Sequence, residues 1–242
     1  MRAENPPMAL GGNAFLALWN DIAVARGAEY DQWHTLEHVP ERVAAHGFLG
    51  ARRYVGSIRA QHRYFTLYDL DSLAVLESPE YLDLLQHPTR WSASMRPDFT
   101  NVIRAACNVV RSQGTGVGAA LACLCVDGST PSGELDAALD AVSSMPRVNA
   151  CHLGAAANDN RDPAFRPSTA AGYALRGFDR IALVEAFDRD AAQAALSMLR
   201  ERLMLQQLPA DFGADVFDLA FVFPGANANE RASHRRRYWD GS

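Results

Sequence analysis

The order of apolar and polar positions divides the chain into two halves that repeat one series of elements. In the first half, apolar runs and period-two alternation predict strands at 13–22, 48–57, 62–70 and 103–111, with helical regions at 29–46 and 71–101. The second half repeats this order, with strands at 116–126, 148–155, 180–187 and 214–223 and helices at 133–144 and 191–208. Both halves therefore follow the strand-helix-strand-strand-helix-strand plan of a ferredoxin-like unit.

Internal similarity supports a duplication. Two segments of the first half can be laid on the second: YFTLYDLD at 64–71 on IALVEAFD at 181–188, and ARRYVG at 51–56 on ACHLGA at 150–155. These pairings place Arg53 opposite His152 and Tyr68 opposite Glu185. We predict an α+β fold of two tandem ferredoxin-like βαββαβ repeats, packed sheet to sheet as an α+β barrel.

The predicted boundaries follow this repeat. Repeat 1 comprises 13–113 and repeat 2 comprises 114–225, between a flexible N-terminus at 1–12 and a polar C-terminal tail at 226–242. A long polar loop at 158–179 in repeat 2 is either a lid or a decoration. Such a chain could close the barrel alone, as a monomeric pseudo-dimer, or pair further as a homodimer.

Prolines and aspartates predict where the helical regions begin and end. Pro40 lies inside the first region, so we expect a break near Val39 and a second short helix that begins at Pro40. Further prolines divide 71–101 into short helices. Asp71 and Asp188 each follow a predicted strand and would cap the helix after it.

Composition excludes several kinds of chemistry and partner. All 23 basic residues are arginine, so the chain offers no amine for a lysine Schiff base and no P-loop lysine. A formal net charge of −5 disfavours nucleic acid, whose binding needs clustered cations. The four cysteines lack C-x-x-C spacing and are expected to be buried free thiols. No run of ~18 apolar residues occurs, so we expect no membrane partner. Reduced cysteines, and an N-terminus without the apolar core of a signal peptide, predict a cytoplasmic location.

The segment richest in reactive side chains is W-H-x-x-E-H-V-P-E-R at 33–42. Together with G-F-x-G-A-R-R-Y at 47–54 and S-P-E-Y-L-x-L-L-x-x-P-T-x-W at 78–91, it resembles the EthD-like branch of the dimeric α+β barrel superfamily. The resemblance implies two ferredoxin-like units packed sheet to sheet, with a pocket inside the barrel or beneath the helices. Members include cofactor-free monooxygenases, polyketide cyclases, lactone isomerases and some haem binders.

The histidines of this segment suit proton transfer better than metal binding. His34 and His38 are spaced i,i+4 and could share a helix face, but no third ligand is near and the pattern is not H-E-x-x-H. Haem-using relatives with two such halves in one chain take their iron ligand from a second-half helix, and 191–208 contains no histidine. We therefore expect no metal and no tightly bound cofactor.

Period-two spacing on the middle strands of the first half predicts a polar sheet face. Buried hydroxyl and guanidinium groups need partners, which either a ligand pocket or solvent would supply. In a pocket, the catalytic candidates are His34, His38 and Tyr68. The substrate-binding candidates are Arg53, Tyr64, Thr66, Trp33, Trp91 and Asn108. His152 and Glu185 would form a second acid-base pair if they face each other.

The leading functional hypothesis is a cofactor-independent enzyme that uses acid-base chemistry on a small aromatic or conjugated oxygenated metabolite. In this scheme one histidine moves a proton, while Arg53 and Tyr68 hold the developing anion. Lyase, isomerase or cyclase chemistry is expected. A cofactor-free EthD-like monooxygenase is the nearest alternative, and a non-catalytic protein that binds a small ligand or joins an assembly is the other.

Overall fold

The computed structural model describes residues 10–57, 60, 62–157, 178–204 and 213–225. The predicted polar tail, and nearly all of the predicted flexible N-terminus and long loop, lie outside these residues. Within the described part, no helix combines the length and apolarity that a membrane span requires.

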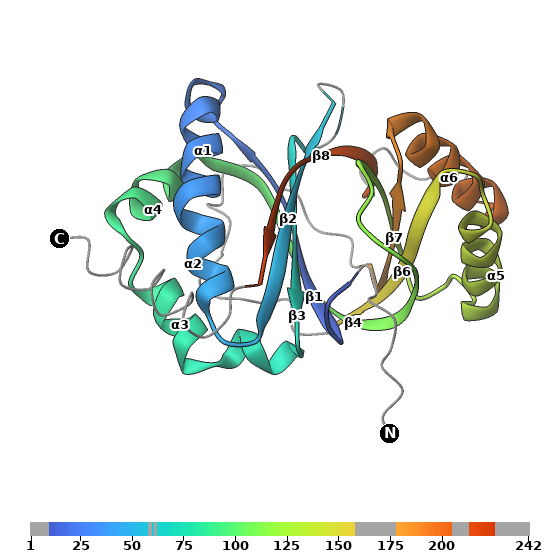
Figure 1. The fold of residues 1–242 in the computed structure, drawn as a ribbon, viewed down its shortest axis with the longest axis horizontal. Coiled ribbons are helices and arrows are strands. Elements are labelled where there is room, and N and C mark those ends of the chain that lie inside the picture. The colour runs from blue at the N-terminus through green and yellow to red at the C-terminus, as the bar shows by residue number, and fades with distance from the viewer. Residues whose placement is uncertain (1–9, 58–59, 61, 158–177, 205–212, 226–242) are drawn as a thin grey trace.

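Eight antiparallel strands close into a barrel (Figure 1). They are β1 (Ala14–Ile22), β2 (Phe48–Gly56), β3 (Tyr64–Leu70), β4 (Phe99–Gly114), β5 (Ala120–Val126), β6 (Val148–Ala156), β7 (Arg180–Ala186) and β8 (Ala214–Pro224). Their order is β1-β3-β2-β8-β5-β7-β6-β4, and β4 pairs with β1 to close the ring. The first half thus contributes β4-β1-β3-β2 and the second β8-β5-β7-β6. The predicted α+β class is confirmed, as one closed eight-stranded barrel.

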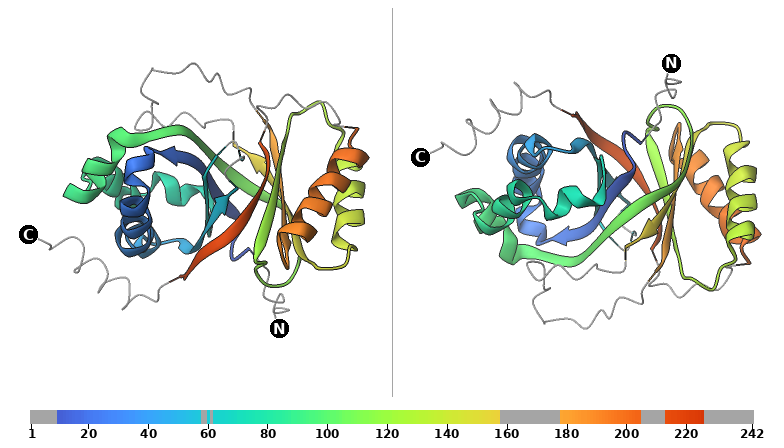
Figure 2. Two further views of the ribbon diagram at one scale, coloured as in Figure 1. Left: turned by 90° about the horizontal axis from the view of Figure 1, so that it is seen from above. Right: turned by 90° about the horizontal axis from the view of Figure 1, so that it is seen from below.

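Helices cover the two halves on opposite flanks of the barrel (Figures 1 and 2). The first-half flank carries α1 (Gly27–Trp33), α2 (Val39–Ala44), α3 (Pro79–Gln86) and α4 (Arg90–Met95), with 3-10 turns at Val24–Arg26, Leu73–Glu77 and Arg96–Asp98. The second-half flank carries α5 (Ser132–Ser143) and α6 (Arg189–Arg202). Short helices in 71–101 agree with the proline pattern, and the Ser78 and Thr89 side chains cap α3 and α4.

The second-half sheet packs on α5 and α6 through aliphatic side chains. All seven residues of β5 are buried, because one side of the strand faces the barrel interior and the other faces the helices. Leu135, Leu139 and Leu199 are at most 1% exposed, and burial of each stabilises the fold by roughly 1.5–3 kcal/mol. The Asp188 side chain accepts the Ala191 N–H and caps α6, as predicted.

Two predictions at the ends of first-half elements are wrong. Asp71 does not cap a helix, because the 3-10 turn after β3 begins past Ser72. The helix also does not break at Val39, because α1 and α2 join through a π-helical turn, His34–His38, in which the Val39 N–H donates to the His34 carbonyl. A proline crowds the carbonyl four residues before it, and the wider π turn relieves that crowding at Pro40.

The predicted pairing of residues between the halves is wrong by one position. Tyr68 points toward the first-half helices, whereas Glu185 points into the barrel. Arg53 also faces the helices, whereas His152 lies on the inner side of β6, opposite its helix-facing neighbours. Adjacent strand residues face opposite sides, so an offset of one residue exchanges the two faces of a sheet. Val184, and not Glu185, shares the helix-covered face that Tyr68 occupies in the first half.

Candidate active site

Arg53 of β2 and Thr66 and Tyr68 of β3 face the first-half helices. Thr66 Oγ1 lies 3.3 Å from His34 Nε2, and the Arg53 guanidinium pairs with the Asp31 carboxylate. Arg53, Thr66 and Tyr68 are 4%, 1% and 1% exposed. This face is therefore enclosed between sheet and helices, and the solvated alternative does not apply to it.

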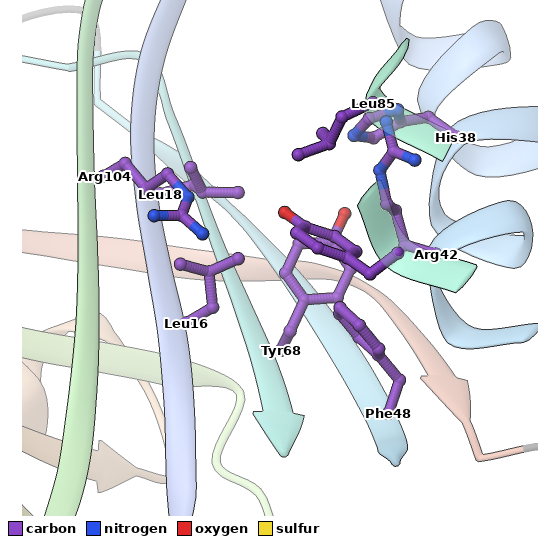
Figure 3. A pocket seen from close by; sticks show the side chains of 9 residues that line it. Leu16, Leu18, His38, Arg42, Phe48, Tyr68, Leu85 and Arg104 are labelled. Atoms are coloured by element: carbon purple, nitrogen blue, oxygen red, sulfur yellow. The ribbon is translucent and has the colours of Figure 1, made fainter. Parts of the chain in front are cut away.

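One cavity lies between this face and the helices (Figure 3). Its lining residues come from the four first-half strands, the π turn, α2 and α3: Leu16, Leu18, His38, Arg42, Phe48, Tyr68, Tyr81, Leu85 and Arg104. Its volume of about 20 Å³ is enough for about one water molecule. Of the predicted catalytic residues, the cavity brings together His38 and Tyr68.

His38 is held beside the cavity by the π turn and by Trp33. The two rings lie 4.4 Å apart between centroids, at an interplanar angle of 32°. His38 Nδ1 is buried and has no hydrogen-bond partner among the described residues. Burial, followed by the positive charge of Arg42, lowers the pKa of His38 well below its usual range. The imidazole is therefore neutral near pH 7 and can accept a proton.

Tyr68 presents an unpartnered hydroxyl to the same cavity. Its oxygen is buried, and no described residue hydrogen-bonds to it. Burial raises the pKa of Tyr68, so the phenol stays protonated and is a hydrogen-bond donor near neutrality. A buried hydroxyl without a partner costs about 1–3 kcal/mol, which a bound ligand atom would offset.

Two arginines that the sequence reasoning did not select complete the cavity. Arg42 extends from α2 and Arg104 from β4, and in Figure 3 they reach toward the space around Tyr68 from opposite sides. Arg42 is the last residue of the 33–42 segment, so its place in that segment could have identified it as a site residue. No local sequence pattern distinguishes Arg104 from other strand residues. The cavity can therefore present a neutral base, a hydroxyl donor and two cations to one small molecule.

His34 lies beside this group but does not line the cavity. Its ring is 5.4 Å from that of His38, and Nδ1 has no partner among the described residues. Burial, then the charge of Arg53, lowers the pKa of His34 well below its usual range. His34 and Thr66 therefore form a buried neutral pair next to the cavity.

Arg53 and Tyr64 form a separate cluster at the α1 end of the sheet. The Arg53 guanidinium carbon lies 5.3 Å from the Tyr30 ring centroid and 5.2 Å from that of Tyr64. These cation–π contacts and the ion pair with Asp31 hold the guanidinium beside α1, although its buried Nε has no hydrogen-bond partner among the described residues. The structure therefore does not bring Arg53 or Tyr64 to the cavity.

The two predicted tryptophans join helices and do not line the cavity. Trp33 Nε1 donates to Ser92 Oγ at 3.1 Å, and Ser92 Oγ donates to the buried Glu37 carboxylate at 3.0 Å. Trp91 Nε1 donates to Glu29 at 3.1 Å. Trp33 acts on the site only through its contact with His38.

Asn108, His152 and Glu185 also lie away from the cavity. Asn108 is exposed on β4. His152 and Glu185 are inside the barrel, but His152 Nδ1 bonds to Ser112 Oγ at 2.7 Å and burial lowers the pKa of His152 to about 3. Glu185 accepts instead from Arg52, so the expected acid-base pair between the two is not formed.

The interior network around Glu185 links the two halves. Arg52 Nη1 donates to Glu185 at 2.9 Å and Arg52 Nη2 donates to Asp69 at 2.6 Å. The Tyr54 hydroxyl and the Gly118 N–H also donate to Glu185, each at 2.9 Å. Every carboxylate in this network has partners, in contrast with the cavity groups.

The described residues contain no cluster of three or more His, Cys, Asp or Glu side chains that could hold a metal ion. The four cysteines are buried free thiols, as predicted. Burial raises the pKa of Cys151 to about 12, so its thiol is protonated and inert near neutrality.

Comparison with known proteins gives a fold assignment. The sequence matches no protein-family profile and no curated protein. Among solved structures, an anthrone oxidase-like protein is 12% identical with a TM-score of 0.57, and the match covers 89% of this chain and 94% of that one. A protein assigned as a monooxygenase from Fusobacterium nucleatum is 11% identical with a TM-score of 0.51, over 89% of this chain and 96% of that one. The chain therefore shares the fold of these two proteins, here an α+β barrel of eight antiparallel strands.

Proposed function

We propose that this chain is a cofactor-independent enzyme that removes a proton from a small conjugated, oxygen-bearing molecule bound in the first-half cavity. One observation carries the proposal: unpartnered buried atoms of His38, Tyr68 and Arg42 converge on one small, largely apolar cavity. We further infer that the two halves arose by duplication and that the second half is mainly structural. The shared strand order supports the duplication.

His38 is the proposed base. Its lowered pKa keeps the imidazole neutral, but the same positive surroundings oppose formation of an imidazolium. A substrate anion beside Arg42 would offset that positive field and stabilise the protonated His38. Proton transfer and anion formation are therefore favoured together, with the Tyr68 hydroxyl donating a hydrogen bond to the anionic oxygen.

Two reaction types follow from the same anion. Return of the proton to another atom, or loss of a leaving group, gives isomerase or lyase chemistry. Alternatively, the carbanion adds to dioxygen and forms a C–O bond, and the resulting peroxide anion takes up a proton. The hydroperoxide then loses its remaining C–H proton together with hydroxide, as one water molecule, and leaves a ketone. The names of the two structural relatives favour this oxygenation for a phenol- or anthrone-like substrate.

Substrate binding requires the cavity to enlarge. A volume of about 20 Å³ cannot hold an aromatic molecule. Leu85 and Tyr81 of α3 form one wall, so we infer that α3 shifts or its side chains change rotamer when a ligand binds.

Hydrogen–deuterium exchange at the acidic carbon of anthrone tests the proton-transfer step without oxygen. Under anaerobic conditions we expect the protein to accelerate exchange, and His38→Asn to slow it by roughly 10²–10⁴-fold. His87→Asn, at an exposed surface histidine, should leave exchange unchanged. Oxygen uptake and anthraquinone absorbance in air then separate oxygenation from isomerisation. Wild-type exchange rates in His38→Asn would falsify the assignment of the base.

A non-catalytic binding protein is the second candidate. The lowered pKa of His38 favours it, because such an imidazole is a weak base in the absence of a bound anion. Binding of anthrone detected by tryptophan fluorescence, with no acceleration of exchange, would support this candidate over the enzyme.

A further inference from the structure

We propose that the natural ligand of the first-half cavity carries a carboxylate or phenolate group when it binds, and that Arg42 and Arg104 hold this anion between them. The inference rests on the proposed function, because it takes the same cavity as the binding site. It adds the charge of the ligand and the two residues that select it.

Arg42 is a buried cation that is incompletely neutralised. It is 5% exposed, and its Nη1 has no hydrogen-bond partner among the described residues. The Glu41 carboxylate lies 3.8 Å from that nitrogen, beyond hydrogen-bond distance, and the Tyr81 ring centroid lies 5.8 Å from the guanidinium carbon. Buried charges in proteins are normally paired and hydrogen-bonded, so this nitrogen is available to an anion.

Arg104 supplies a second cation from the sheet side. It is half-buried on β4, its buried Nε has no hydrogen-bond partner, and it forms no ion pair within the described residues. Figure 3 shows its guanidinium group directed from the sheet toward the side of Tyr68 opposite Arg42. A carboxylate or phenolate between the two could accept from both guanidinium groups, which are suited to planar oxyanions.

The rest of the lining selects an organic anion. No carboxylate lines the cavity, and His38 is neutral, so the net charge of the lining is positive. Leu16, Phe48 and Leu85 form apolar walls that suit a hydrocarbon or aromatic body. The predicted ligand class is therefore a compact, mostly apolar organic acid or acidic phenol.

Paired probes of equal shape and different charge test this inference. We expect benzoate to bind at least ~10-fold more tightly than benzamide, measured by calorimetry or by fluorescence of Trp33, which contacts His38. Arg104→Gln and Arg42→Gln should each weaken benzoate binding by ~10-fold or more while benzamide changes by less than about 3-fold. Arg90→Gln, at an exposed arginine, is the matched control.

The following outcomes decide the matter. Arg104 is half-buried and carries the test if Arg42→Gln does not fold. Equal binding of benzoate and benzamide, or unchanged benzoate binding in a folded arginine variant, would overturn the inference. Chloride that displaces benzoate at equal concentration would overturn the organic-acid class. If His38→Asn loses proton exchange but keeps the preference for benzoate, both proposals stand. Wild-type exchange in His38→Asn, with the preference for benzoate intact, would overturn only the proposed base. Catalysed exchange in a protein that does not prefer benzoate would overturn only this inference.

Discussion

In both half-barrels helices cover one face of the sheet, but the side chains on that face are aliphatic in one half and partly polar in the other. In the second half, this face consists of aliphatic side chains such as Val184 that pack against α5 and α6. In the first half, Thr66 and Tyr68 occupy the same face together with Arg53, and buried polar atoms lack partners. A fold that can cover this face with apolar contacts on one flank has no structural need for polar groups on the other. The difference therefore points to ligand binding in the first half.

The barrel interior offers a second contrast, because the charged groups of its Arg52–Glu185 network have partners. Arg52 bridges Asp69 and Glu185 and so joins the two halves across the barrel interior. Buried polar groups with complete networks hold one arrangement of the elements around them. The ionic network inside the barrel is thus hydrogen-bonded throughout its carboxylates, whereas several polar atoms under the first-half helices have no partner among the described residues.

The largest predicted effect comes from breaking the satisfied network. Arg52→Met leaves the buried Glu185 and the partly buried Asp69 without their cation, and we expect the free energy of unfolding to fall by about 3–5 kcal/mol. Urea denaturation followed by circular dichroism measures this loss. Arg189→Met removes an exposed arginine–carboxylate pair with Asp218 and should cost no more than about 1 kcal/mol. Equal costs for both variants would show that the interior network does not hold the halves together.

A matched pair of near-isosteric exchanges tests the two helix-covered faces. Val184→Thr introduces a hydroxyl into the fully buried aliphatic cluster of the second half and should destabilise the protein by about 1–3 kcal/mol. Tyr68→Phe removes a buried hydroxyl that has no partner among the described residues and should change stability by less than about 1 kcal/mol. Thermal denaturation of both variants gives the comparison. A larger cost for Tyr68→Phe than for Val184→Thr would mean that the first-half polar groups serve packing.

Local patterns in the sequence predicted most of the fold and part of the site. Period-two alternation placed Arg53, Thr66 and Tyr68 on one face, because the direction of a strand side chain is a local property. It did not show which of them share a cavity. Arg104 approaches Arg42 only after β4 pairs with β1, and that juxtaposition is tertiary. The offset that matched Tyr68 to Glu185 arose because apolar runs fix the position of a strand more firmly than its register.

The smallest predicted effect concerns Glu41, beside the cavity on α2. Burial raises the pKa of Glu41. The positive charge of Arg42 acts to lower this pKa, whereas the negative charge of Glu37 raises it further. Its folded pKa therefore lies above the unfolded value of about 4.5, and between the two the folded state binds the proton more tightly. Stability from this group is present below pH 4.5 and is lost as pH rises through the folded pKa. We expect Glu41→Gln to gain stability relative to wild type over that window.

The stability difference between Glu41→Gln and wild type, measured by urea denaturation from pH 4 to pH 8, isolates this group from the other buried ionisable side chains. Glu77→Gln, at an exposed carboxylate of the same half, should show no comparable trend. A difference that shrinks with rising pH would mean that the ion pair with Arg42 outweighs desolvation of the carboxylate. In that case Glu41 would neutralise Arg42 in the folded protein, and the cavity would hold one free cation fewer for an anionic ligand.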